Sequence, residues 1–229
     1  MTEKITIKSF SAFDNPELTQ KYIEGHQKVL ELYGVTKVTS SKLRWVEDPN
    51  SIVVSVESGS GKILGGGRIQ IASELYPLPI EDAIGEMDNR IYQLIKEYTK
   101  FKTAEFCGLW NSREIAGYGI GSIFLARVGI SLTDKLNLGS LFGLCSPATL
   151  NLSLNVGFTV LEVLGNKGTF YYPKEDLLAT ALFLPDPHLL HHANETDRKR
   201  ILSLRKNPFQ NATESGPKGT VDINYSLGI

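Results

Sequence analysis

The fold is decided by residues 103–136, which read TAEFCGLWNSREIAGYGIGSIFLARVGISLTDKL. The apolar run from Ala104 to Trp110 predicts a buried strand, and the proline-free apolar run from Ile123 onward predicts a long helix. Between them lies a glycine cluster, Ala116 to Ser122. Glycine lets the backbone approach a ligand closely, and a helix that begins just afterwards points its free N–H groups and positive dipole end at an anion. The stretch therefore predicts a strand, a phosphate-binding loop and a helix.

The glycine spacing excludes two common nucleotide-binding motifs. A dinucleotide fingerprint places Gly-x-Gly-x-x-Gly close to the end of its strand, and a Walker loop places Gly-Lys-Ser/Thr at the start of its helix. Here Gly117, Gly119 and Gly121 alternate, no lysine follows them, and residues 111–116 separate them from the strand. Neither motif is present.

The layout resembles the pyrophosphate loop of the GNAT superfamily of acyl-CoA N-acyltransferases, whose pattern Gln/Arg-x-x-Gly-x-Gly/Ala ends a strand and opens a helix. Two registers fit. The later one matches Gly119-Ile120-Gly121-Ser122 and places Ala116 where Arg or Gln is usual. The earlier one matches Gly117-Tyr118-Gly119, is similar to the histone acetyltransferase branch, and places Glu114 there. The residues from Ile120 onward favour the later register, and in either one the usual basic or amide side chain is missing.

The resemblance implies an α/β fold, with a mixed, mostly antiparallel central sheet flanked by helices, and acetyl-CoA or another acyl-CoA as the bound substrate. In this family a splayed strand offers backbone groups to pantetheine, and the loop N–H groups hold the pyrophosphate. The residues of this sequence that the resemblance assigns to the cofactor are Cys107, Gly108, Leu109, Gly117, Tyr118, Gly119, Ile120, Gly121, Ser122 and Asn151.

The implied reaction is direct attack of an amine on the acyl-CoA thioester, which needs a base to remove a proton from the ammonium and polarisation of the carbonyl. Glu105 shares a strand face with Thr103, which occupies the position of the glutamate base in the histone acetyltransferase branch. Glu105 is thus the candidate base. The alternative is that it is a paired or solvent-facing strand carboxylate.

Ser153 occupies the position, four residues before Gly157-Phe158, where many family members carry a tyrosine acid. The serine could solvate the leaving thiolate through water. A polar residue on an exposed helix face explains it equally well.

Outside the central stretch, periodicity and turn residues predict further elements in the order that the family shows, and the resemblance spans residues 53–184. The predicted strands cover residues 4–10, 51–57, 62–71, 140–145, 158–164, 177–184 and 220–225, and the predicted helices cover residues 15–33, 146–155 and 195–206. Within the second of the hairpin strands, Gly65 to Gly67 mark either a close approach by another segment or a glycine-softened strand.

The segment 72–102 is longer than the tight turn that most family members have before the cofactor strand. Prolines break its first part, and Ile80 to Tyr98 carries apolar residues at helical spacing, which predicts one inserted amphipathic helix. A similar insert occurs in autoinducer synthases and long-chain N-acyl amino acid synthases, between Gly-x-x-Arg-Leu and a strand that begins with Glu. Gly65 to Ile69 and Glu105 resemble that pattern, although the Arg of those synthases is Gly108 here.

Length, composition and net charge limit the number of domains and the classes of partner that we expect. With 229 residues, 41% of them apolar, the chain can bury one sizeable core, so we expect a single domain over 1–229 with an insert at 72–102 and a C-terminal extension at 185–229. A net charge of -1 supplies no basic field for nucleic acid. No apolar run approaches the ~20 residues of a membrane span, and the first residues contain no signal-peptide core. We therefore expect a cytoplasmic protein without nucleic-acid or membrane partners.

Cys107 and Cys145 lie in apolar strand-like runs, which predicts reduced buried thiols and disfavours a nucleophilic cysteine. His188, His191 and His192 form a short histidine cluster, but no second group of metal-ligating residues accompanies it, so no metal is expected.

Three functions stay open at this stage. The first is an N-acetyltransferase acting on a small-molecule or peptide amine, as a monomer or a homodimer. The second is a longer-chain N-acyltransferase similar to the autoinducer and N-acyl amino acid synthases, since the insert and the small residues Gly108 and Ser153 could widen an acyl tunnel. The third is a noncatalytic CoA-binding domain, because the usual Arg/Gln and Tyr are missing.

Overall fold

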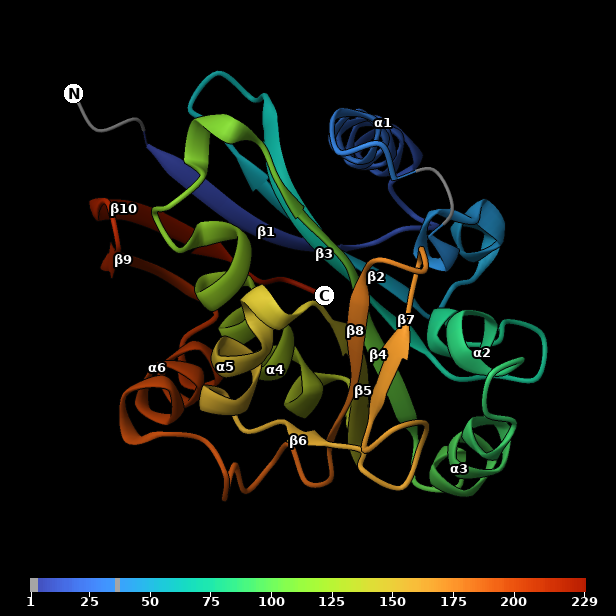
Figure 1. Cartoon of the computed structure of the whole chain (residues 1–229). Coiled ribbons are helices and arrows are strands. Elements are labelled where there is room, and N and C mark those ends of the chain that lie inside the picture. The colour runs from blue at the N-terminus through green and yellow to red at the C-terminus, as the bar shows by residue number, and fades with distance from the viewer. Residues whose placement is uncertain (1–3, 36–37) are drawn as a thin grey trace.

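The computed structural model describes residues 4–35 and 38–229, and one sheet of ten strands runs through them (Figure 1). Its strands are β1 (Ile5–Ser11), β2 (Ser51–Glu57), β3 (Ile63–Ile71), β4 (Thr103–Asn111), β5 (Ser140–Cys145), β6 (Thr159–Val160), β7 (Thr169–Tyr171), β8 (Leu178–Leu184), β9 (Phe209–Gly216) and β10 (Gly219–Ser226). The strand order is β6-β8-β5-β4-β3-β2-β1-β10-β9, with β7 paired to β8. Only β4–β5 and β1–β10 are parallel among the described pairs, so the predicted mixed, mostly antiparallel α/β sheet is confirmed.

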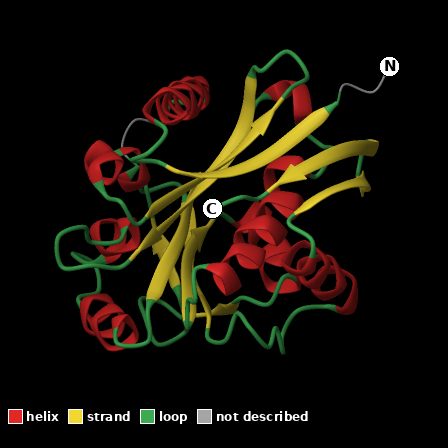
Figure 2. Cartoon of the chain, turned by 180° about the vertical axis from the view of Figure 1, so that it is seen from behind, coloured by secondary structure: helices red, strands yellow, loops and turns green. Residues whose placement is uncertain are grey.

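Helices cover both faces of the sheet. They are α1 (Pro16–Leu32), α2 (Pro79–Ile84), α3 (Arg90–Thr99), α4 (Leu125–Lys135), α5 (Pro147–Asn155) and α6 (Glu195–Lys206), with short turns η1 (Thr39–Ser41), η2 (Leu43–Glu47), η3 (Arg113–Ile115) and the π-helical η4 (Ile120–Phe124). Figures 1 and 2 show α1, α2 and α3 along one face and α4, α5 and α6 along the other. None of the helices in the described ranges is long and apolar enough to cross a membrane.

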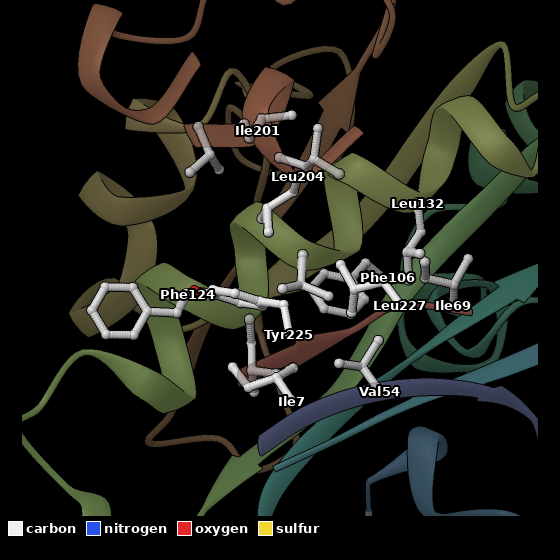
Figure 3. Close-up of a cluster of buried hydrophobic side chains, with 14 of the residues drawn as sticks. Ile7, Val54, Ile69, Phe106, Phe124, Leu132, Ile201, Leu204, Tyr225 and Leu227 are labelled. Carbon is white, nitrogen blue, oxygen red and sulfur yellow. The ribbon is translucent and has the colours of Figure 1, made fainter. Parts of the chain in front are cut away.

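The largest apolar cluster lies between the sheet and helices α4 and α6. Figure 3 shows Ile7, Val54 and Ile69 of the sheet among side chains from those helices, including Leu132 and Ile201. Two smaller clusters lie on the other face, one beneath α2 and α3 and one beneath α1. The sheet is therefore buried on both sides over its central strands.

Strand β4 shows how alternation directs side chains to the two faces. Ala104 and Phe106 belong to the cluster beneath α4. Because successive side chains on a strand point to opposite faces, Glu105 and Cys107 face α1 and α2 instead. The strand thus carries its carboxylate on the face opposite the glycine loop and α4.

A buried ion network fastens the C-terminal extension to the helix that follows the glycine loop. Arg127 of α4 donates from Nε to Asp197 Oδ1 of α6 at 2.6 Å and from Nη1 to Glu214 Oε2 of β9 at 3.0 Å. The hydroxyl of Tyr225 on β10 donates to the other oxygen of Glu214 at 3.3 Å. The extension is thereby part of the support beneath α4.

The inserted segment forms two helices, so the single helix predicted over residues 80–98 is wrong. Gly85 follows α2 at a point where a side chain would meet the ring of Tyr92. Asp88 then accepts hydrogen bonds from the backbone N–H and the guanidinium of Arg90, the first residue of α3. The apolar spacing continues across this break, which is why periodicity alone did not reveal it.

Most other predicted elements begin and end within one residue of the observed ones, but two strands were missed. The strand predicted over 158–164 is only the two-residue β6 in the structure, and β7 follows it in a segment for which the sequence predicts no element. The edge strand β9 has the polar sequence FQNATESG and pairs only with β10. It was missed because an edge strand with solvent on one side carries no run of apolar residues.

Candidate active site

The sheet splits between β4 and β5. These strands pair in parallel only at Thr103–Ser140, Ala104–Leu141 and Glu105–Phe142. Beyond that point β4 continues along β3 to Asn111, and β5 continues along β8 to Cys145. The two strands therefore diverge and leave a gap in the middle of the sheet.

A β-bulge in β4 lies beside this split. Gly66 pairs with Trp110 and Arg68 pairs with Cys107, so two residues of β4, Gly108 and Leu109, stand opposite one residue of β3. Gly108 has φ +59°, a conformation that favours glycine. The hydroxyl of Tyr22 on α1 donates to the Gly108 carbonyl at 2.6 Å and holds the bulge in place.

The three glycines of β3 mark close approaches by other segments. A Cβ on Gly65 would lie 2.8 Å from the Trp110 carbonyl oxygen, and one on Gly66 would lie 2.4 Å from the Val54 carbonyl oxygen. A Cβ on Gly67 would lie 2.9 Å from the Phe106 ring. Of the two readings that the sequence left open, close approach is the one that the structure confirms.

A cavity of about 410 Å³ fills the split, and its lining comes from both faces of the sheet. We call the part on the α4–α5 face the loop half; its lining includes Gly121, Ser122, Ala126, Thr149, Leu152 and Ser153. We call the part on the α1–α2 face the carboxylate half; its lining includes His26, Leu30, Thr39, Ala83, Glu105 and Tyr172. One cavity thus connects the glycine loop with the strand carboxylate.

The loop half offers backbone donors at a helix start. Gly119 has φ +83°, and its carbonyl accepts from the N–H of Phe124 at 3.1 Å, which closes the first turn of η4. The N–H group of Gly121, a residue that lines the cavity, lies at this helix start and lacks an intrahelical acceptor. Since η4 continues directly into α4, the positive end of the helix dipole lies at the same place. Donors and dipole together fit an anion such as a pyrophosphate.

The first part of the glycine cluster packs against the C-terminal hairpin instead of the cavity. The Gly117 carbonyl accepts from the N–H of Lys218 at 2.9 Å, and a Cβ on Gly117 would lie 2.7 Å from the Lys218 side chain. Gly216 lies against the carbonyl of Tyr118. These contacts favour the later of the two alignments, in which Gly119 and Gly121 form the loop motif.

The residues that the resemblance assigned to the cofactor therefore fall into two groups. Those that line the cavity are Cys107, Gly108, Leu109, Gly121 and Ser122. Those outside its lining are Gly117, Tyr118, Gly119, Ile120 and Asn151, of which Asn151 is exposed on α5.

Glu105 is buried in the carboxylate half, with 2% of its surface exposed. Its Oε2 accepts from the N–H of Ile80, in the first turn of α2, at 2.7 Å. Burial raises the pKa of Glu105 to about 7, although the Ile80 hydrogen bond and the charge of Arg68 lower it. A pKa near 7 suits a general base. Of the two alternatives, burial excludes the solvent-facing carboxylate, while the hydrogen bond from Ile80 agrees with the paired one.

Three polar residues of the carboxylate half were not singled out from the sequence: His26, Thr39 and Tyr172. The N–H of Thr39 donates to the Tyr172 hydroxyl at 2.6 Å, and Thr39 Oγ1 donates to the Pro79 carbonyl at 2.8 Å. These bonds join three distant segments into one wall. The signal that could have revealed His26 is its place on the buried face of α1, four residues after Tyr22.

Ser153 and the two cysteines are weaker chemical candidates. Ser153 lines the loop half, but its hydroxyl donates to the Thr149 carbonyl at 3.1 Å within α5. Burial raises the pKa of Cys107 to about 12 and that of Cys145 to about 11. Both cysteines are therefore neutral thiols at physiological pH and poor nucleophiles.

The histidine cluster of the C-terminal extension forms a local contact with α4. His188 Nδ1 lies 3.0 Å from Asp134 Oδ1. In the described part of the chain, no group of three or more His, Cys, Asp or Glu residues is arranged to hold a metal ion.

No protein-family model and no curated protein sequence matches this chain, but solved structures do. FeeM, an N-acyl amino acid synthase from uncultured soil microbes, matches with a TM-score of 0.63 at 14% identity, over 86% of this chain and 99% of FeeM. BjaI, a CoA-dependent acyl-homoserine lactone synthase solved with SAM and isopentyl-CoA, matches with a TM-score of 0.53 at 10% identity, over 86% of this chain and 89% of BjaI. At such identities the likeness shows the fold alone. The chain has the GNAT-type acyl-CoA N-acyltransferase fold, in a form similar to an N-acyl amino acid synthase and an acyl-homoserine lactone synthase.

Proposed function

We propose that the protein is an acyl-CoA-dependent N-acyltransferase that transfers an acyl group to a small-molecule or peptide amine. The observation that carries the proposal is the single cavity through the split sheet. It joins a helix start suited to a pyrophosphate on one face to the buried carboxylate of Glu105 on the other. Acyl-CoA would enter from the loop half and the amine from the carboxylate half, so that the thioester and the nitrogen meet between β4 and β5.

In the proposed reaction, ionised Glu105 takes a proton from the bound ammonium group. The freed amine attacks the thioester carbonyl carbon, a C–N bond forms, and the C–S bond breaks as the tetrahedral intermediate collapses. The nitrogen gives up its second proton to the departing thiolate, so that CoA leaves through the loop half as the thiol, and Glu105 returns its proton to solvent. The bulge at Gly108 and Leu109 places backbone groups outside the β3–β4 ladder, where an N–H can polarise the carbonyl oxygen.

A longer acyl chain is the second candidate substrate, and the apolar part of the cavity lining favours it. The carboxylate half has apolar walls from Leu30, Val38, Pro79 and Ala83, which could hold a hydrocarbon chain. The match to BjaI, which was solved with isopentyl-CoA, supports the same direction.

The test is a transfer assay that crosses an acyl-CoA series, from acetyl to dodecanoyl, with a panel of amines and follows the release of free CoA thiol. We expect release that requires both substrates. A preference for acetyl-CoA with no activity beyond butyryl-CoA removes the longer-chain substrate. Tight CoA binding without turnover on any amine contradicts catalysis and leaves a binding domain.

The role of Glu105 is tested by the pH profile of kcat/KM. In the wild type, kcat/KM should rise as pH passes through about 7, because the carboxyl must be ionised to accept a proton. Glu105→Gln should lose this limb along with most of its activity. Glu114→Gln is the matched control, since Glu114 is exposed and pairs with Lys62 away from the cavity. An unchanged profile in Glu105→Gln removes Glu105 as the base.

A further inference from the structure

His26 is a buried histidine whose imidazole forms no hydrogen bond with any residue that the structure describes. Its side chain is 6% exposed and lines the carboxylate half of the cavity. The contact it does make is with the ring of Tyr22, at 6.2 Å between centroids. The ring nitrogens of His26 are not among the buried polar atoms that the protein seals off without a partner, so they are open to the cavity. A ligand in the cavity would supply the missing partner.

The imidazole lies next to the bulge that flanks the split. A Cβ on Gly108 would lie 3.9 Å from His26 Cε1. Glu105 is on the same strand, three residues before Gly108, and faces the same half of the cavity. The carboxylate half of the cavity is therefore lined by both His26 and Glu105, on either side of the space that a substrate nitrogen would enter.

His26 is neutral in this setting. Burial, with the charge of Arg68, lowers its pKa to about 4. A neutral imidazole has one nitrogen that donates a hydrogen bond and one that accepts. It can therefore accept an N–H from an ammonium group but is too weak a base to remove the proton, which leaves that step to Glu105.

We propose that His26 is the acceptor-binding residue of the site: its unprotonated nitrogen accepts one N–H of the substrate ammonium, while Glu105 accepts another. This inference rests on the proposed N-acyltransferase function and adds a substrate class to it. Two separate hydrogen-bond acceptors select a nitrogen that carries at least two N–H groups, as a primary ammonium does. An alcohol of the same shape has one O–H and satisfies only one of them.

The direct test is NMR on the full chain, labelled with ¹⁵N-histidine and saturated with CoA. Phenethylamine is the probe, and phenethyl alcohol is its matched control. We expect the imidazole signals of His26 to shift in a saturable way with the amine and not with the alcohol, while those of His188, His191 and His192 stay in place. A phenethylamine titration that leaves the His26 signals unmoved, in protein that binds CoA, overturns the proposal.

Variants of His26 give an independent readout, because they should change KM for the amine and leave KM for acyl-CoA nearly unchanged. His26→Phe keeps a ring of similar shape but no nitrogen, so KM for the amine should rise about tenfold or more, while KM for acyl-CoA stays within about twofold. His26→Gln returns an acceptor and should recover most of the loss. His192→Gln, at an exposed position, should behave as wild type.

The outcomes separate this inference from the proposed function. Wild-type protein that neither binds CoA nor releases it from any acyl-CoA overturns both. Wild-type protein that transfers the acyl group, with an unchanged amine KM in His26→Phe, overturns the role of His26 alone.

Discussion

Glu105→Gln should stabilise the folded protein at alkaline pH while it removes activity. Burial raises the pKa of this carboxyl from its ordinary 4.5 to about 7. Because folding raises the pKa of this carboxyl, the folded chain holds the carboxyl proton more tightly than the unfolded chain does. The contribution of Glu105 to the free energy of unfolding is therefore complete below about pH 4.5 and is lost as pH rises through about 7. At about 1.4 kcal/mol per pKa unit, the loss approaches about 3 kcal/mol above pH 8.

Glutamine keeps the shape of the side chain but cannot ionise. Its amide oxygen can still accept from the N–H of Ile80, while its NH₂ group needs an acceptor that the carboxylate did not, which offsets about 1 kcal/mol of the gain. The net stabilisation at about pH 9 should therefore be about 2 kcal/mol, and at about pH 5 it should vanish or reverse.

The assay is urea unfolding of Glu105→Gln and wild type at both pH values. Glu114→Gln serves as the control for any general effect of removing a carboxylate, because Glu114 is exposed. A difference in unfolding free energy between Glu105→Gln and wild type that is the same at both pH values would mean that folding does not raise the pKa of Glu105. The expected pattern, more stability with less activity, is typical of a group held in place for chemistry.

Two further substitutions probe the support of the site. Arg127→Met removes the guanidinium that bonds both Asp197 and Glu214, although Arg200 stays 3.7 Å from Glu214, and should lower the free energy of unfolding by about 3 kcal/mol. Lys199→Ala, at an exposed ion pair, should change it by less than about 0.5 kcal/mol, and equal effects of the two substitutions in urea unfolding contradict the network. Tyr22→Phe removes the hydrogen bond to the bulge and should lower stability by about 1 kcal/mol and raise KM for acyl-CoA. An unchanged KM would show that the backbone alone holds the bulge.

The parts of the fold that sequence predicted are those encoded within one short stretch. The apolar run of β4, the alternating glycines and the helix α4 are adjacent in sequence, so their order is visible without knowledge of distant contacts. Strand β9 is the opposite case. Its polar sequence becomes a strand only because β10, which itself pairs with β1, offers it a free edge.

The residues of the site likewise fall into those that one short stretch encodes and those that distant segments bring in. Glu105, Gly108 and Gly121 come from the contiguous central stretch, and all three line the cavity. His26 and Tyr172 reach the cavity from α1 and from the segment after β7, and no local pattern pairs them with β4. The raised pKa of Glu105 likewise depends on its burial beneath α2, which packs there through tertiary contacts.

If the proposed function is right, acyl-CoA occupies the cavity between β4 and β5. Gly143 lines this cavity, and a Cβ built on it has only ordinary contacts, at 3.7 Å from the Phe106 carbonyl oxygen and the Phe158 ring. Gly143→Val should therefore fold with a melting temperature near that of the wild type but fill part of the split.

The most direct measurement is calorimetric titration of both proteins with CoA. We expect the wild type to bind CoA with a Kd of about 1–100 μM. Gly143→Val should bind CoA with a Kd at least about tenfold higher. A wild type that shows no CoA binding, or a folded Gly143→Val that binds CoA as tightly as the wild type, contradicts the placement of acyl-CoA in this cavity.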